Sequence, residues 1–240
     1  MQGQPMQFNP SARISVHFIG PENTADAKAP LLIIDDCLLM PHALVEAAKT
    51  AQFSNNDGDF YPGIRAPLPP QYCHTMAQAL TPLLAPYRDF NSASLDYSFS
   101  AFSLTTQASQ TLKPIQCIPH YDDTHTSKFA LVHYLFQQDL GGTGFFQHKK
   151  TGYWQINPQN QNHYMKTLGT QATTEGLPEA AYIQGSTPLF EEYFRVTPMF
   201  NRAIVYPCNL LHSGLINAQT GLSPTPTEGR LTANLALQAG

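Results

Sequence analysis

Two side chains near the middle of the chain have the spacing of metal ligands. In the segment Ile118-Pro119-His120-Tyr121-Asp122, an imidazole and a carboxylate stand two residues apart. On a β-strand such residues point to the same face, about 6.6 Å apart along the strand. A second imidazole, His212, follows much later in the chain. Two histidines and one carboxylate hold Fe(II) on one side and leave its other positions open, so we predict such a site.

Two residues near the end of the sequence have the chemistry to bind a carboxylate. Arg230 and Thr232 are again two apart, so on a strand they share a face. The planar guanidinium can donate to both oxygens of a carboxylate. Arg202 also precedes an apolar run and is a competing candidate for this role. A metal with open positions and a carboxylate clamp together indicate an oxygenase that uses a dicarboxylic acid.

These segments resemble the Fe(II)/2-oxoglutarate-dependent dioxygenase superfamily, most closely its prolyl-hydroxylase-like branch. The resemblance rests on residues 119–122, on 201–207 leading into 211–213, and on 229–235, and it extends over about residues 98–237. It implies a mainly β fold with flanking helices, arranged as a double-stranded β-helix (jelly-roll) barrel. It also implies that His120, Asp122 and His212 hold Fe(II), with 2-oxoglutarate as the co-substrate.

The resemblance assigns further residues around the co-substrate. It implies that Arg230 binds the C5 carboxylate of 2-oxoglutarate and that Thr232 assists with its hydroxyl. Tyr134 stands where the family often places a tyrosine near 2-oxoglutarate, although a core tyrosine with a satisfied hydroxyl is the simpler interpretation. The reversed pair Asp123 and His125 is an alternative to the predicted ligands.

Three other features near the motifs could belong either to the site or to the framework around it. His148 ends a β-type run and could line the substrate side, whereas His133 has the opposite facing to Tyr134 and is predicted to be structural. The loop Tyr61-Pro62-Gly63-Ile64-Arg65-Ala66-Pro67 is either part of the substrate entrance, with Arg65 meeting an anion, or a rigid connector.

The pattern along the chain predicts one domain over residues 1–240, with a strand and helix layer over 1–94 and a β-helix core over 95–240. Residues 13–18 and 31–34 are expected to be strands, 42–52 and 71–84 helices, and 55–70 a loop. Short β-type runs separated by turn residues then favour a sandwich or barrel. These runs cover 97–105, 115–119, 129–136, 143–148, 153–156, 202–206 and 230–237.

An insertion is predicted over about residues 157–200, between strands of the core. Residues 158–176 are polar and rich in Gln, Asn and Thr, and 188–194 are expected to be helical. The insertion is either a lid near the mouth of the site or a helical pair that packs on the outside.

The composition excludes several classes of function. The chain has 240 residues, 42% hydrophobic content, 12% charged residues and a net charge of −4, which gives no basic surface for nucleic acid or an anionic membrane. Neither a signal peptide nor a run of about 18 apolar residues is visible, so we expect a cytoplasmic protein. The four cysteines lack the spacing of a zinc site, and most are expected to be buried thiols.

An oxygenase that hydroxylates a small molecule or a peptidyl side chain is therefore the leading prediction. The sequence identifies neither the substrate nor the oligomeric state. One alternative is a non-catalytic binding module on the same barrel. Another is a cupin-like metalloenzyme without 2-oxoglutarate, which would have no need for the Arg230 and Thr232 pair.

Overall fold

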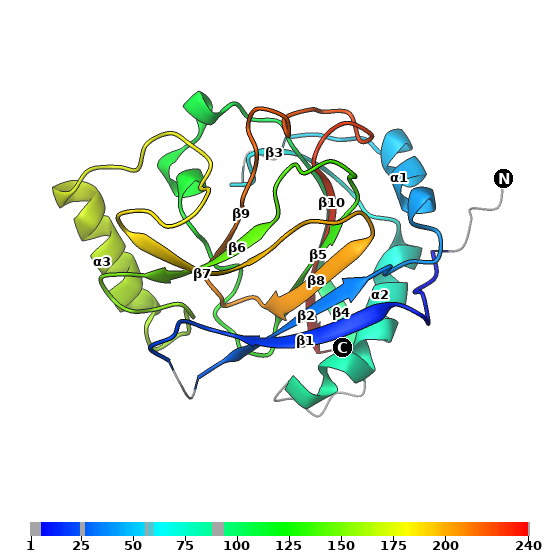
Figure 1. Ribbon diagram of the computed structural model, residues 1–240, viewed down its shortest axis with the longest axis horizontal. Helices are drawn as coiled ribbons and strands as arrows, with labels where there is room; N and C mark the ends of the chain where they lie inside the picture. Colours follow the sequence, from blue (N-terminus) through cyan, green and yellow to red (C-terminus); the bar gives the residue numbers. More distant parts are fainter. Residues whose placement is uncertain (1–5, 25–26, 56–57, 59, 88–93, 240) are drawn as a thin grey trace.

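The chain forms two antiparallel β-sheets with a few helices in the computed structural model shown in Figure 1. The structure describes residues 6–24, 27–55, 58, 60–87 and 94–239. The mainly β prediction with flanking helices is confirmed. Within the described residues the strands remain in two separate sheets and do not close into a single barrel.

The larger sheet has seven strands and joins the start of the chain to its end. Its order is β1 (Arg13–Ile19), β2 (Ala29–Asp35), β8 (Arg202–Pro207), β5 (Phe129–Tyr134), β10 (Leu231–Ala239), β4 (Leu95–Thr105) and β3 (Gly63–Ala66). The smaller sheet has three strands, in the order β7 (Phe190–Val196), β6 (Thr143–His148) and β9 (His212–Gly214).

The described part of the chain contains three α-helices, which lie around the sheets. They are α1 (Pro41–Thr50), α2 (Pro70–Leu84) and α3 (Gln161–Thr174). The first two confirm the predicted helices, and each begins with a proline in its first turn, where the missing N–H costs no hydrogen bond. Short 3₁₀ turns cover Ala85–Tyr87, Ser109–Thr111 and Pro114–Cys117. Among the described helices none is long and apolar enough to cross a membrane.

The central strands β5, β8 and β10 of the large sheet are buried on both faces, and the two faces have different partners. Side chains such as Leu231 and Ala233 pack in one core with Leu44 of α1 and Leu80 of α2. Figure 1 shows both helices on the same side of the molecule, away from α3. The opposite face packs in a second core, which contains Tyr134 of β5 and Phe145 of β6. This inner face therefore looks toward the small sheet.

Antiparallel pairing places one row of inner-face residues side by side across the large sheet. Thr232 of β10 pairs with Ser103 of β4 on one side and with Tyr134 of β5 on the other. Tyr134 pairs in turn with Arg202 of β8, and Ser103 pairs with Arg65 of β3. Directly opposite residues share a face, so this row crosses the interior between the sheets.

Two predicted strands are replaced by less regular structure. Residues 115–119 do not form a strand: a 3₁₀ turn covers Pro114–Cys117, and pairing is limited to an isolated bridge between His120 and His212. Pro119 has no N–H to donate to a ladder, which explains why pairing begins only after it. Residues 153–156 likewise form only an isolated bridge, between Gln155 and Leu210.

Two predictions about the remaining segments were wrong. Residues 188–194 are not helical, because Phe190–Val196 form β7 and pair with β6. Their aromatic residues suit a half-buried strand, and this outweighs the helix preference of the two glutamates. The predicted loop over 55–70 contains β3, where Gly63 approaches the backbone of Leu104 so closely that a Cβ would lie 2.0 Å from its carbonyl oxygen.

Candidate metal centre

Backbone hydrogen bonds bring the three predicted ligands together from two distant parts of the chain. His120 and His212 bond reciprocally, with N–O distances of 2.9 and 2.8 Å, and this attaches the His-x-Asp segment to β9. The amide of Asp122 donates to the carbonyl of Cys208, just beyond β8, at 2.9 Å. The segment is therefore held at both residues that carry the predicted ligands, although it is not a regular strand.

The side chains converge on one point. His120 Nε2 lies 3.7 Å from Asp122 Oδ1, and His212 Nε2 lies 3.6 Å from Asp122 Oδ2. One ligand atom from each residue lies within 4.8 Å of the others. Metal bonds of about 2.1 Å at right angles would place neighbouring ligand atoms about 3 Å apart, so small side-chain rotations suffice to close the set.

A hydrogen bond fixes which nitrogen of His212 is available. His212 Nδ1 lies 2.9 Å from the carbonyl oxygen of Leu210, which can only accept, so Nδ1 carries the hydrogen. The lone pair is then on Nε2, the atom that faces Asp122. Metal-binding histidines commonly use their second nitrogen in this way.

The electrostatic surroundings favour the form of His120 that can bind a metal. Its pKa lies below the ordinary value of 6.5 because the surrounding protein partly desolvates the ring and because His212 lies beside it, while Asp122 acts in the opposite direction. The side chains of His120 and Asp122 are 50% and 41% exposed, whereas that of His212 is 6% exposed. The group is therefore open to solvent on one side and anchored in the core on the other.

Arg230 lies just before β10 and is 4% exposed. Its Nε donates to the carbonyl of Gly141 at 2.9 Å and its Nη2 to the carbonyl of Gly142 at 3.0 Å. The guanidinium carbon also lies 6.0 Å from the ring centre of Tyr134. Since a guanidinium has five N–H groups, the end formed by Nη1 and Nη2 retains hydrogens for another acceptor. These backbone carbonyls offset part of the cost of burying the guanidinium.

The other two residues of the predicted co-substrate site lie on the inner face beside Arg230. Thr232 pairs with Tyr134 across the strands, and its hydroxyl accepts from the side-chain Nδ2 of Asn234 at 3.1 Å. The hydroxyl of Tyr134 shares a hydrogen bond of 2.8 Å with that of Thr143 on β6. Tyr134 therefore links the two sheets and is a core tyrosine whose hydroxyl already has a hydrogen-bond partner.

The competing arginine, Arg202, is engaged elsewhere. Its Nε and Nη2 lie 2.6 and 3.1 Å from the two carboxylate oxygens of Asp35, and its Nη1 donates to the carbonyl of Thr197. All three nitrogens thus have partners, and the pair joins β8 to β2. This geometry favours Arg230 over Arg202 as the carboxylate clamp.

The alternative ligands do not join the group. Asp123 is paired with Lys128 at 2.6 Å and accepts from the amide of His125. His133 lies on the helix side of the sheet, between the Tyr72 hydroxyl and the Asn201 side chain, as its predicted structural role requires. His148 is buried against Gln171 of α3 and Thr151, so it does not line the candidate site as one interpretation expected.

Tyr206 is a neighbour of the site to which the sequence assigned no role. Its ring lies edge-on to that of His212, with centres 4.9 Å apart. Burial raises the pKa of its hydroxyl, the negative charge of Asp122 raises it further, and Arg230 lowers it. The strand phase could have identified it, because Tyr206 is four residues from Arg202 and shares its face of β8.

The predicted insertion borders the candidate centre without forming a separate layer. The side chain of Gln161, at the start of α3, donates to the hydroxyl of Tyr121 at 2.9 Å, and the rings of Tyr164 and Tyr121 meet edge-on. Tyr121 stands between the two ligands of the His-x-Asp segment. Further along, β7 belongs to the small sheet, so this part of the insertion is framework.

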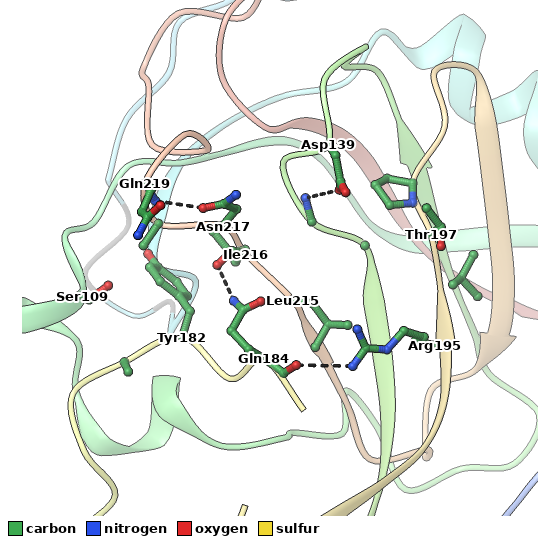
Figure 2. Close-up of a pocket in the computed structure, with 16 residues that line it drawn as sticks. Ser109, Asp139, Tyr182, Gln184, Arg195, Thr197, Leu215, Ile216, Asn217 and Gln219 are labelled. Carbon is green, nitrogen blue, oxygen red and sulfur yellow. Dashed lines mark hydrogen bonds between the residues drawn. The ribbon is translucent and has the colours of Figure 1, made fainter. Parts of the chain in front are cut away.

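A cavity of about 530 Å³ lies beside the site rather than at it. It is lined by four segments, 139–142, 181–184, 195–198 and 215–219, together with Ser109, and none of the three predicted ligands belongs to its lining. Figure 2 shows Gln184 bridging it, donating to the carbonyl of Ile216 and accepting from Arg195. The shared residues Gly141 and Gly142 separate this cavity from Arg230.

Comparison with known proteins places the chain in a family but assigns it no activity. No curated protein matches the sequence. Among solved structures it is similar to the crystal structure of HygX from Streptomyces hygroscopicus with nickel and 2-oxoglutarate bound, at 16% identity and a TM-score of 0.45, over 87% of this chain and 82% of that one. A likeness of this degree leaves the function to be argued from the residues themselves. A family of unknown function, DUF6445, matches residues 10–237, and the chain therefore belongs to that family.

Proposed function

We propose that this protein is an Fe(II)/2-oxoglutarate-dependent oxygenase of a small molecule or a peptidyl side chain. The observation that carries the proposal is the convergence of His120, Asp122 and His212, with the free lone pair of His212 facing the carboxylate. Two imidazole nitrogens and one carboxylate oxygen are a donor set that suits Fe(II) and leaves coordination positions open. With 2-oxoglutarate and O₂, Fe(II) at such a site supplies an oxidant for C–H bonds.

The path of the chain supports a double-stranded β-helix. In the described residues, β4, β5, β8 and β10 lie in the large sheet. The bridge at His120 and the strands β6, β7 and β9 belong to the small one. Eight segments divided in this way between two facing sheets are what a jelly roll requires. The candidate ligands then lie at the open end of the small sheet, facing the interior.

The residues around the centre have distinct parts in the proposal. Arg230 binds the far carboxylate of 2-oxoglutarate through its remaining N–H groups, and Thr232 lies on the same face of β10. The carbonyls of Gly141 and Gly142 hold the guanidinium in place before the co-substrate arrives. Such pre-organisation reduces the conformational entropy that binding would otherwise cost.

Binding measurements separate the steps of this proposal. Mn(II), which has the same ligand preferences and does not turn over, is titrated into the protein, and 2-oxoglutarate is then titrated into the loaded protein. We expect both to bind, and we expect Fe(II), O₂ and a pool of metabolites to release succinate from 2-oxoglutarate. Absence of metal binding would refute the proposed centre.

A metal-binding protein without 2-oxoglutarate is the second candidate. It is favoured by one observation: two nitrogens of Arg230 already bond to backbone carbonyls, which a purely structural arginine would also do. The same titrations distinguish the two, because this candidate binds Mn(II) but gives no heat with 2-oxoglutarate.

A further inference from the structure

The first strand of the large sheet, β1, leaves one of its two edges open. It pairs with β2 over its whole length, from Arg13 opposite Asp35 to Ile19 opposite Ala29, with no bulge. Among the described strands only β2 pairs with it, so the backbone groups along its other edge have no strand to bond to in this part of the chain. Figure 1 shows β1, in dark blue, at the outer end of the sheet. An edge of this kind accepts a further β-strand.

This edge lacks the features by which most proteins prevent such pairing. Edge strands are commonly protected by lysine, proline, a bulge or an inward-pointing charge. The sequence of β1, Arg-Ile-Ser-Val-His-Phe-Ile, contains no lysine, proline or acidic residue. Its one fixed charge, on Arg13, stands at the first position and pairs with Asp36 at 2.9 Å. Residues 14–19 therefore carry no fixed charge that would repel another strand.

One face of β1 is apolar and exposed. Ile14, Val16 and Phe18 alternate along the strand, so they point to the same face, and they are 39%, 41% and 60% exposed. This is the helix side of the sheet, because Leu32, directly opposite Val16 on β2, belongs to the core that includes α1 and α2. The ring of Phe18 meets that of Tyr87 edge-on, with centres 5.9 Å apart. A row of exposed apolar side chains beside an open edge is typical of a protein interface.

The order of residues in β1 is complementary to itself. When a second copy runs antiparallel with a two-fold axis at Val16, Ile14 lies opposite Phe18 of that copy. Ser15 then lies opposite His17 of the second copy, so apolar residues meet apolar ones on one face and polar residues meet polar ones on the other. The two Arg13 side chains are six positions apart along the pair, about 20 Å, which exceeds the screening length of about 8 Å in physiological salt.

We propose that two copies of this chain associate through β1, in antiparallel pairing about a two-fold axis at Val16, so that their large sheets become one continuous sheet. The open backbone edge requires a strand as its partner. The polarity order and the absence of like-charge contacts fit β1 itself in that place. The same surface then serves both copies, as closed two-fold symmetry requires. The predicted metal ligands lie outside β1, so this proposal is independent of the proposed function.

The substitution Val16→Lys places two like charges opposite each other at the proposed axis. Directly opposite side chains on paired strands lie about 5 Å apart, so we expect the dissociation constant of the dimer to rise about a hundredfold. Sedimentation velocity at micromolar concentration should give twice the mass of one chain for the wild type and a monomer for the variant. Because the Val16 side chain is partly exposed, the variant should retain the circular-dichroism spectrum of the wild type.

Val16→Glu supplies the matched partner. Alone it should also be monomeric, but an equal mixture of Val16→Lys and Val16→Glu should form mixed dimers, because opposite charges then meet at the axis. A misfolded variant would not be rescued in this way. Met165→Lys is the control: this residue of α3 is 48% exposed, comparable with Val16, and its variant should remain dimeric.

Three results would overturn the proposal. A monomeric wild type would leave the open edge to a strand of another protein. A dimeric Val16→Lys variant would place the contact between copies on another surface. A mixture of the two charged variants that stays monomeric would exclude the axis at Val16.

Discussion

The three predicted ligands differ in how strongly the fold restrains their side chains. His212 is buried and its ring is anchored through Nδ1, whereas His120 and Asp122 reach solvent. The 3.6 and 3.7 Å separations from Asp122 are longer than those in a closed coordination sphere. We therefore expect a metal to draw the two exposed side chains toward the fixed imidazole, with little movement of the backbone.

Asp122 is the only carboxylate in the group, so its removal should be decisive. In Asp122→Ala, Mn(II) affinity should fall by about a hundredfold or more, because an anionic ligand is lost from a divalent cation. Isothermal titration calorimetry measures this directly. Asp123→Ala is the control, because Asp123 is occupied by Lys128, and it should retain metal affinity. The opposite ranking of the two variants would transfer the ligand role to Asp123.

The two arginines give a second comparison between single residues. Arg230→Ala should weaken 2-oxoglutarate at least tenfold, since a charge-assisted contact to a carboxylate is worth about 1.5–3 kcal/mol. Arg202→Ala should leave that affinity unchanged and lower the free energy of unfolding, because Asp35 loses its nearer cationic partner. Titration and urea unfolding measure the two effects. Loss of binding in Arg202→Ala alone would place the clamp on β8.

At the scale of elements, the turn between β5 and β6 positions the predicted clamp. Gly141 has a φ of +96°, and a Cβ there would lie 1.7 Å from the carbonyl oxygen of Leu215. A Cβ on Gly142 would lie 1.9 Å from the carbonyl oxygen of Val196. The turn can therefore pass between β9 and β7 only without side chains. Its carbonyls reach Arg230 as a result.

Gly142→Ala should disturb the clamp through the backbone carbonyl that accepts from Arg230. The added methyl must displace either the turn or β7, so the carbonyl that accepts from Arg230 moves. We expect a lower melting temperature and weaker 2-oxoglutarate binding, with Mn(II) affinity retained. Gly169→Ala in α3 is the control: a Cβ there meets nothing within 4 Å, and the helix should gain about 0.5–1 kcal/mol. Equal 2-oxoglutarate affinity in Gly142→Ala would contradict the role of the turn.

The elements that the sequence predicted correctly are those with strong local signals. The α1 and α2 helices have apolar residues at three- and four-residue steps and a proline at the start. Tertiary pairing decided the rest. The β7 strand exists because β6 offers it a partner, and the His-x-Asp segment is held by β9 and Cys208 rather than by a ladder of its own. The intrinsic helix and strand preferences of these residues predict neither of these interactions.

At the scale of the whole molecule, the sequence predicted which residues would meet but not what surrounds them. Residues 120, 122 and 212 come together as the motif order indicated. The partners of Arg230, the ion pair of Arg202 and the position of Tyr206 depend on register between distant strands. The register between strands depends on how both faces of the sheet pack, and a single sequence does not reveal this packing.

The packed interior should also make stability depend on pH. Desolvation lowers the pKa of His133 to about 4, and the hydrogen bond that its Nε2 donates to the side-chain oxygen of Asn201 acts in the opposite direction, so the folded state keeps this ring neutral. The unfolded chain takes up the proton below about pH 6.5. Stability from this group is therefore complete above pH 6.5 and is lost as pH falls toward 4, by roughly 2 kcal/mol between pH 7 and pH 5.

Comparison with His133→Gln isolates that contribution. Urea unfolding at pH 7 and pH 5 should show the wild type losing more free energy of unfolding than the variant, which has no ring to protonate. The difference between the two proteins should shrink by about 2 kcal/mol at the lower pH. A difference that stays constant would assign the pH dependence to other groups.

The reciprocal hydrogen bonds between His120 and His212 affect which metal ion the proposed site would bind. Because the backbone holds these residues together, the centre is assembled before any ion arrives, and folding does not select the ion. A preformed set of two imidazoles and a carboxylate follows the general affinity order, in which Zn(II) and Cu(II) bind more tightly than Fe(II). Loading with iron then depends on which ions surround the protein. A zinc-filled preparation would be folded, stable and inactive.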